Sequence, residues 1–231
     1  MKFIGNFFKT EWAKLSQMNF TDKRQYIWEY YRLHIFGIAA LTFFVGSMLN
    51  TMIFNPPRQE YVYFVWVGPF VTAGMLDEFA QELDVIVENP DRYMVRAANY
   101  NLEGLDPQMI MGLQTRFIAQ MQQRLLDLFV LSGDNLYDFS ASGFVLPFRH
   151  FMSVVEETNP AVHEILKERL VEVTFYHEDY GLITEYMAAD LYGVPFIEKF
   201  GIHTDDLYLA IVINSQRFER VIRALEVLLD V

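Results

Sequence analysis

Residues 33–54 form an apolar run in which no charged residue follows His34. An α-helix rises 1.5 Å per residue, so the roughly 20 residues that begin at Ile35 and end at Phe54 match a bilayer core about 30 Å thick. The sequence therefore predicts one transmembrane helix that holds the chain in a lipid bilayer. A cleavable signal peptide is the alternative, but its apolar region would be shorter and closer to Met1.

The charges on the two sides of this run differ. Residues 1–54 hold 6 lysines and arginines and 3 acidic residues, whereas the remainder holds 12 basic and 27 acidic residues. Basic residues beside a span favour a cytoplasmic N-terminus. We therefore expect a single-pass protein of the cell membrane with its acidic C-terminal domain outside the cytoplasm. Such a domain repels phosphate backbones, which excludes a nucleic-acid partner.

Four parts of the chain follow from this pattern. Residues 1–32 form a cytoplasmic juxtamembrane segment, amphipathic over residues 3–15, and Thr21 is expected to cap the helix that enters the span at residues 33–54. Asn55-Pro56-Pro57 ends that helix because proline cannot donate a backbone hydrogen bond. Residues 55–60 are then a linker, and residues 61–231 are long enough for one extracytoplasmic α/β domain.

Strand and helix patterns alternate within this domain. Residues 61–68, 92–100 and 125–131 read as strands, separated by helices that begin at Thr72 and at Asp106-Pro107. This βαβαβ order predicts a parallel sheet. Further strands are expected at residues 171–177 and 206–214. Further helices are expected after Asp134 or Asn135, after Asn159-Pro160 and after Ser215.

Candidate binding residues follow the predicted strands, because open parallel sheets bind ligands at the carboxyl ends of their strands. One further candidate, Tyr192, lies in the irregular stretch after residue 190. The full set of candidates is Gly68, Phe70, Thr72, Asn101, Ser132, Asp134, Asn135 and Tyr192. Capping a helix is the alternative role for Asp134 and Asn135, and an ordinary turn is the alternative for Gly68 and Phe70.

Catalytic and metal-binding patterns are weak. His177-Glu178-Asp179 is the sharpest cluster, but successive strand residues alternate faces and would not converge on one ion or proton. The motifs HExxH and GxSxG do not occur, and the chain has no cysteine to form a disulfide, ligate a metal or carry a lipid. We therefore predict no catalytic residue, no metal and no cofactor, and keep an enzyme only as a third hypothesis.

Three segments resemble one family when they are taken in order. LLDLFVLSGDNLYDFSASGFVLPF, LYGVPF and DLYLAIVINSQRFERVIRALEVLL are similar to phrases of bacterial extracellular solute-binding proteins of type II. The chain looks most like a reduced, membrane-anchored branch from Gram-positive bacteria, in which KRQYIWEYYRLHI enters the membrane. The resemblance implies a doubly wound, periplasmic-binding-protein-like domain with one main lobe. It also implies a small second lobe between Phe148 and Tyr192.

The resemblance and the predicted span together suggest two functions. The first is a non-catalytic, membrane-tethered domain that binds a small solute or serves as an accessory or sensory subunit of another membrane protein. The second is a protein-interaction scaffold of a cell-envelope assembly that has no small-molecule ligand.

Overall fold

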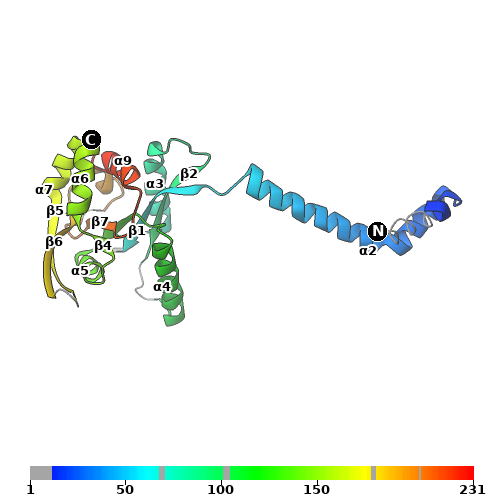
Figure 1. Ribbon diagram of the computed structural model, residues 1–231, viewed down its shortest axis with the longest axis horizontal. Helices are drawn as coiled ribbons and strands as arrows, with labels where there is room; N and C mark the ends of the chain where they lie inside the picture. The colour runs from blue at the N-terminus through cyan, green and yellow to red at the C-terminus, as the bar shows by residue number, and fades with distance from the viewer. Residues whose placement is uncertain (1–11, 68–70, 101–104, 178–180, 203) are drawn as a thin grey trace. The chain divides into compact units, whose positions relative to one another are not determined.

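The computed structural model describes residues 12–67, 71–100, 105–177, 181–202 and 204–231 (Figure 1). The chain divides into two compact units, Met1–Pro57 and Arg58–Val231. The predicted amphipathic segment at residues 3–15 lies mostly outside the described residues.

The first unit is dominated by one long helix. Helix α2 spans Phe20–Leu49 and continues as a π-helical turn, η1, over Asn50–Phe54; neither contains a buried residue. Among the described residues, Phe20–Phe54 is the one helix that is long and apolar enough to cross a membrane. An exposed apolar surface of this length is typical of a lipid-facing helix, which is compatible with a single-pass membrane protein. The predicted cap was wrong, because α2 begins before Thr21 and Asn19 holds the cap position.

The described residues of the second unit form one mixed, seven-stranded sheet. Its strands are β1 (Gln59–Val67), β2 (Tyr93–Asn99), β3 (Leu128–Leu131), β4 (Val145–Leu146), β5 (Leu170–His177), β6 (Gly181–Asp190) and β7 (Tyr208–Val212). The strand order is β2-β1-β3-β7-β6-β5, and β4 also pairs with β7. Strands β1, β2 and β3 are parallel, as predicted, whereas β4 to β7 pair antiparallel with their neighbours.

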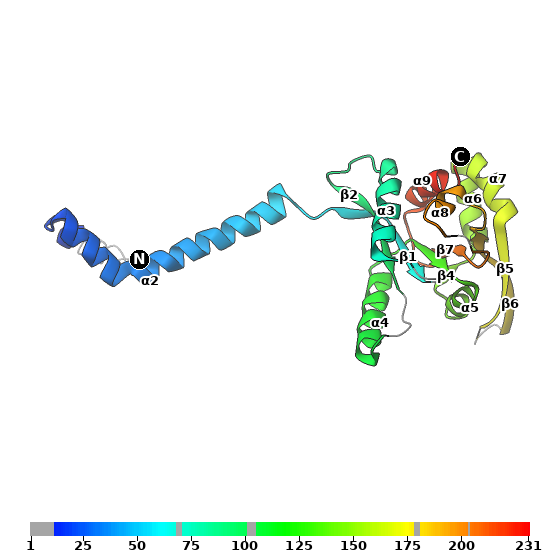
Figure 2. The same cartoon turned by 180° about the vertical axis from the view of Figure 1, so that it is seen from behind.

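Helices cover both faces of this sheet, as Figures 1 and 2 show from opposite sides. The helices are α3 (Ala73–Leu83) with the short turn η2 (Asp84–Ile86), α4 (Pro107–Gln122), α5 (Gly133–Ala141), α6 (Phe148–Thr158), α7 (Pro160–Arg169), α8 (Pro195–Glu198) and α9 (Phe218–Leu228). Phe64 and Trp66 of β1 pack in the layer that contains α3 and α6 to α9, whereas Tyr63 and Val65 pack in the layer of α4 and α5. The alternating strand residues therefore serve two cores, which confirms an α/β fold.

Local capping signals predicted three helix starts correctly. The side chain of Thr72 accepts a hydrogen bond from the Met75 amide, Asp106 accepts one from the Gln108 amide, and Asn159 accepts from two amides of α7. Each oxygen satisfies an amide that has no partner within the helix.

Two predicted helix starts were wrong. Helix α5 begins at Gly133, so Ser132 stands at the cap position instead of Asp134 or Asn135. Helix α9 begins at Phe218 rather than directly after Ser215. The Ser215 hydroxyl instead donates to Asp127, 88 positions earlier in the chain, at 2.9 Å. Its partner is therefore a distant side chain and not an amide of the following helix.

The region between Phe148 and Tyr192 does not form a separate lobe among the described residues. Helices α6 and α7 bury Phe151 and Leu166 in the main core, and β5 and β6 extend the same sheet. Strand β6 was not predicted, because its sequence GLITEYMAAD contains a glycine and two acidic residues. The predicted third strand and the linker are also shorter than expected: β3 begins at Leu128, and β1 begins at Gln59.

Candidate functional site

Strands β1 and β3 are parallel neighbours, but the chain leaves their carboxyl ends toward opposite faces of the sheet. After β1 the chain passes to α3 in one core layer, and after β3 it passes to α5 in the other. Open α/β sheets bind ligands at such a topological switch point, outside the carboxyl ends of the strands. We take this edge of the sheet as the candidate functional site.

Ser132 and Asn135 lie together at this edge. The Ser132 amide donates to the Val67 carbonyl at 3.2 Å, which joins the ends of β1 and β3. The Ser132 hydroxyl accepts a hydrogen bond of 2.7 Å from the side-chain amide of Asn135. Asp134 follows in the first turn of α5 with an exposed side chain. The side chains of Ser132 and Asn135 are therefore hydrogen-bonded to each other, and a ligand would have to compete with this internal hydrogen bond.

The other predicted site residues are more dispersed. Thr72 caps α3 with its hydroxyl. Tyr192 lies just after β6; its amide donates to Asp190, and its carbonyl accepts from Arg169. Strand pairing connects Asp190 to Tyr208 and Tyr208 to Leu131, so Tyr192 follows the same edge of the sheet as Ser132. Gly68, Phe70 and Asn101 lie outside the described residues.

Asp206 is a residue of this edge that the binding prediction did not include. Its carboxylate accepts a hydrogen bond of 2.8 Å from the amide of Gly133, the first residue of α5. A Cβ atom on Gly133 would lie 2.7 Å from that oxygen, so a larger residue there would require the Asp206 side chain to move. The amino end of a helix carries partial positive charge, and anionic ligands bind there. In this chain, Asp206 supplies that negative charge from within the domain.

The electrostatics of this edge are acidic. Burial raises the pKa of Tyr208, and the carboxylates of Asp206, Asp190 and Asp205 raise it further. Repulsion of this kind disfavours another negative charge at the site. Within the described ranges no three histidine or acidic side chains converge on a possible metal position. The edge therefore favours a neutral or cationic group over an anionic one.

Two hollows of the domain are lined by residues that the structure describes. A cavity of about 60 Å³ lies between α4 and the strands β1 and β2, where Tyr100 stacks on Phe117 with ring centroids 4.6 Å apart. It is too small for a metabolite, since ligand pockets usually measure about 300–1,000 Å³. A more open hollow of about 430 Å³ borders the first turn of α9, beside Arg217 and Arg220.

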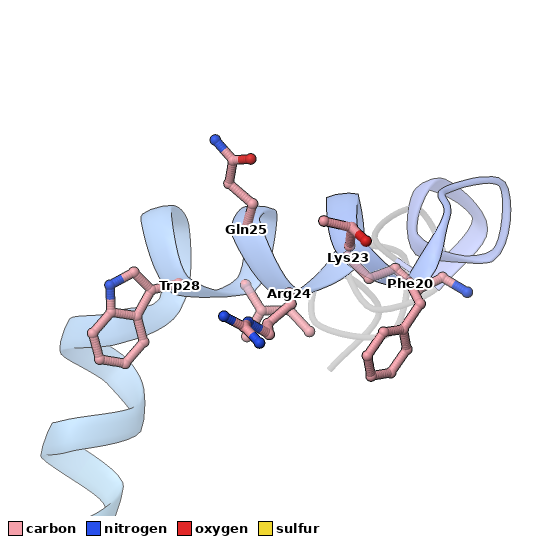
Figure 3. Close-up of a pocket in the computed structure, with 7 residues that line it drawn as sticks. Phe20, Lys23, Arg24, Gln25 and Trp28 are labelled. Carbon is pink, nitrogen blue, oxygen red and sulfur yellow. The ribbon is translucent and has the colours of Figure 1, made fainter.

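A further hollow lies against the first turns of α2 in the other unit (Figure 3). Figure 3 shows the rings of Phe20 and Trp28 on the same side of the helix, with Arg24 between them and Gln25 on the opposite side. Aromatic and basic side chains gather in this way where a membrane helix passes through the headgroup region. This arrangement is therefore typical of the interfacial end of a membrane helix rather than of a solute site.

A buried ionic cluster lies at the opposite edge of the sheet, where β3 begins. Asp127 is fully buried; its carboxylate accepts from the Tyr63 amide, the Ser215 hydroxyl and the Arg217 guanidinium at 2.9 Å each. Arg217 also donates to the carbonyls of Glu60 and Leu125. The cluster thus ties β1, β3 and the start of α9 together. The one signal in the sequence was a single charge within the apolar run LLDLFVL.

The Asp127 cluster is structural rather than catalytic. Burial raises the pKa of Asp127 above its ordinary value, while Arg217 and the donors from Tyr63 and Ser215 act in the opposite direction. Both carboxylate oxygens are occupied by donors of the chain. A general base must lie within hydrogen-bond distance of a substrate proton. The donors around Asp127 leave no carboxylate oxygen open to a substrate.

Asp206→Ala is expected to lower the free energy of unfolding by about 1 kcal/mol, the usual effect of losing a helix-capping acceptor. The matched control is Asp205→Ala, which removes an adjacent exposed carboxylate but leaves the bond to Gly133 intact. Urea unfolding of the two variants measures the difference. Equal stability of the two variants would show that the bond from Gly133 contributes nothing.

Comparisons with known proteins assign neither a family nor a function to the chain. Neither a protein-family model nor a curated protein matches the chain.

Proposed function

We propose that this chain is a single-pass membrane protein whose acidic α/β domain acts outside the cytoplasm as a non-catalytic accessory module. The observation that carries this proposal is the helix Phe20–Phe54, which has no buried residue and is followed after Asn55–Arg58 by a compact domain. A freely diffusing protein has no need of such a helix. A tethered domain instead acts on components of the same membrane.

The charge distribution supports this orientation. Lys23, Arg24 and Arg32 precede the apolar part of the helix, whereas the domain beyond residue 57 is strongly acidic. Positive charge beside a span is retained on the cytoplasmic side. The domain is therefore placed on the outer side of the cell membrane in this proposal.

A protein partner is favoured over an anionic solute by the contact between Asp206 and Gly133. That contact fills the amino end of α5, where a binding domain would hold a carboxylate or phosphate. A neutral or cationic small solute remains the second candidate, because Thr72, Ser132 and Asn135 present polar groups at the same edge. The resemblance to solute-binding proteins supports that second candidate.

The orientation can be tested by cysteine labelling, since the natural chain contains no cysteine. Ser153→Cys lies at an exposed position of α6, and Ser16→Cys lies at an exposed position before the span. A membrane-impermeant maleimide is expected to label Ser153→Cys in intact cells and Ser16→Cys only after permeabilisation. The reverse pattern would contradict the orientation.

Thermal unfolding of the purified full-length chain in detergent tests the accessory role against solute binding. We expect no stabilisation by a panel of amino acids, sugars, polyamines and nucleosides. A solute at 100 times its dissociation constant would add about 2.7 kcal/mol. A solute that stabilises the natural chain but not Ser132→Ala would establish solute binding at the switch point and overturn the accessory role.

A further inference from the structure

Strand β5 forms a free edge of the sheet. It stands at the end of the strand order, and within the described part of the chain it pairs with β6 alone. Figures 1 and 2 both place the β5–β6 hairpin along the outer side of the domain, opposite β2. Natural edge strands are often protected by proline, by charged side chains, especially lysine, or by a β-bulge. The sequence of β5, LVEVTFYH, contains no lysine or proline and one acidic residue, Glu172; its pairing with β6 is irregular between Val171 and Glu172 and regular from Glu172 to His177.

The two faces of the hairpin differ. One face packs into the domain, where Phe175 and Met187 are buried. The other face is exposed and carries a row from each strand; Glu172, Thr174 and Tyr176 of β5 lie opposite Tyr186, Thr184 and Leu182 of β6. The hydroxyls of Thr174 and Thr184 are 2.8 Å apart. Tyr176 is 61% exposed and Leu182 is 75% exposed.

We propose that a second copy of this chain pairs antiparallel along β5, with the two-fold axis at Thr174. A symmetric interface places the same surface of both copies face to face. In this register Thr174 meets the Thr174 of the second copy, and Glu172 meets its Tyr176. No charge lies opposite a like charge, which would destabilise the pair.

The pairing of β5 with β6 inside the hairpin already shows the side-chain pairs that this register would form. On its inner side, Thr174 already faces a threonine, Thr184, and Glu172 already faces a tyrosine, Tyr186. A second copy of β5 offers its threonine and its tyrosine at the same two positions. Strand β5 therefore finds the same two partners on its free side that β6 supplies on its paired side.

Self-pairing is favoured over capture of an unrelated extended peptide. Any peptide can donate backbone hydrogen bonds to an edge, but specificity comes from the side chains of alternate residues. The alternate side chains of β5 pair best with the threonine and tyrosine of a second β5. Anchoring in one membrane also raises the effective concentration of one copy near another. The inference does not depend on whether the domain binds a solute.

Disulfide trapping of the full-length chain in membranes tests the axis. Residues directly opposite across an antiparallel pair have Cα atoms about 4.5–5.5 Å apart, within reach of a disulfide. Thr174→Cys is expected to form covalent dimers on mild oxidation. The matched control is Thr184→Cys, which lies on the same exposed face one strand away and would be about three strand spacings from its counterpart. We expect disulfide-linked dimer for Thr174→Cys and its loss for Thr184→Cys, because Cα atoms more than about 7 Å apart cannot be bridged without movement of the backbone.

A mixed experiment tests the register. Glu172→Cys and Tyr176→Cys are expected to stay monomeric when expressed separately and to cross-link when expressed together. This pair also tests the axis if Thr174→Cys accumulates poorly. Equal cross-linking of Thr174→Cys and Thr184→Cys, or self-cross-linking of Glu172→Cys alone, would overturn the proposal.

Discussion

Asp127→Ala is expected to lower the free energy of unfolding by about 3–5 kcal/mol, because it removes one partner of a buried ion pair. The substitution leaves the Arg217 guanidinium without its carboxylate and removes the acceptor of the Tyr63 amide and the Ser215 hydroxyl. A loss of this size is a large part of the 5–15 kcal/mol that stabilises a typical domain. Urea unfolding of the full-length chain in detergent, followed by tryptophan fluorescence, measures it.

Two control variants separate the ion pair from general disturbance. Asp138→Ala removes an exposed aspartate of α5 and is expected to change stability by no more than about 0.5 kcal/mol. The double variant Asp127→Leu with Arg217→Met removes both charges and is expected to be more stable than Asp127→Ala. A loss below about 1 kcal/mol for Asp127→Ala would mean that the cluster does not hold these segments together.

The contribution of Asp127 to the free energy of unfolding is expected to depend on pH, and the direction follows from its pKa. Burial raises the pKa of folded Asp127 above the ordinary value of 3.8, so the folded state binds the proton more tightly than the unfolded state. The part of its contribution to stability that depends on the bound proton is fully present below pH 3.8 and is lost as the pH rises through the folded pKa, whereas the hydrogen bonds from Tyr63, Ser215 and Arg217 remain. Asp127→Asn cannot lose that proton. The stability advantage of the natural chain over Asp127→Asn should therefore shrink as the pH rises from 4 toward 7.

Ala40→Arg combined with Phe44→Arg is expected to release the protein from the membrane fraction or to prevent its insertion. Both positions lie within α2 and are exposed in the absence of lipid. An arginine at the centre of a span costs about 2.5–3.5 kcal/mol, so the pair costs about 5–7 kcal/mol. Carbonate extraction of membranes, followed by immunoblotting of pellet and supernatant, gives the retained fraction.

The matched control for the anchor is Ala40→Leu combined with Phe44→Leu, which changes the same positions but keeps them apolar. This variant is expected to stay in the membrane pellet. Full retention of the arginine variant would show that the helix Phe20–Phe54 does not act as the anchor.

Sequence patterns predicted the elements whose signals are local. The apolar β-branched run of β1 and the caps at Thr72, Asp106 and Asn159 depend on residues a few positions apart, and all four were correct. Ser215 was assigned to a helix start by the same rule, but its partner Asp127 lies on a distant strand. A cap and a buried tertiary contact require the same hydroxyl, so spacing along the chain cannot distinguish them.

The candidate site shows the same division. The edge of the sheet followed from the βαβαβ order, which places the ends of β1 and β3 side by side. The role of Asp206 did not follow, because its contact with Gly133 spans 73 positions and depends on how β7 enters the sheet. Strands were predicted where β5 and β7 lie, but their antiparallel pairing was not, because β6 has no clear strand pattern of its own and joins them only through its pairing with both.

The contacts of Arg217 also determine when this domain can fold during biogenesis. Arg217 reaches the carbonyl of Glu60, 157 positions earlier and at the start of the first strand, and β7 completes the pairing of β3. A ribosome delivers the chain from the N-terminus, so the strand that contains Glu60 is synthesised long before these partners. The domain cannot complete its core until the segment containing α9 has emerged. Until then its apolar strands are exposed and prone to aggregation.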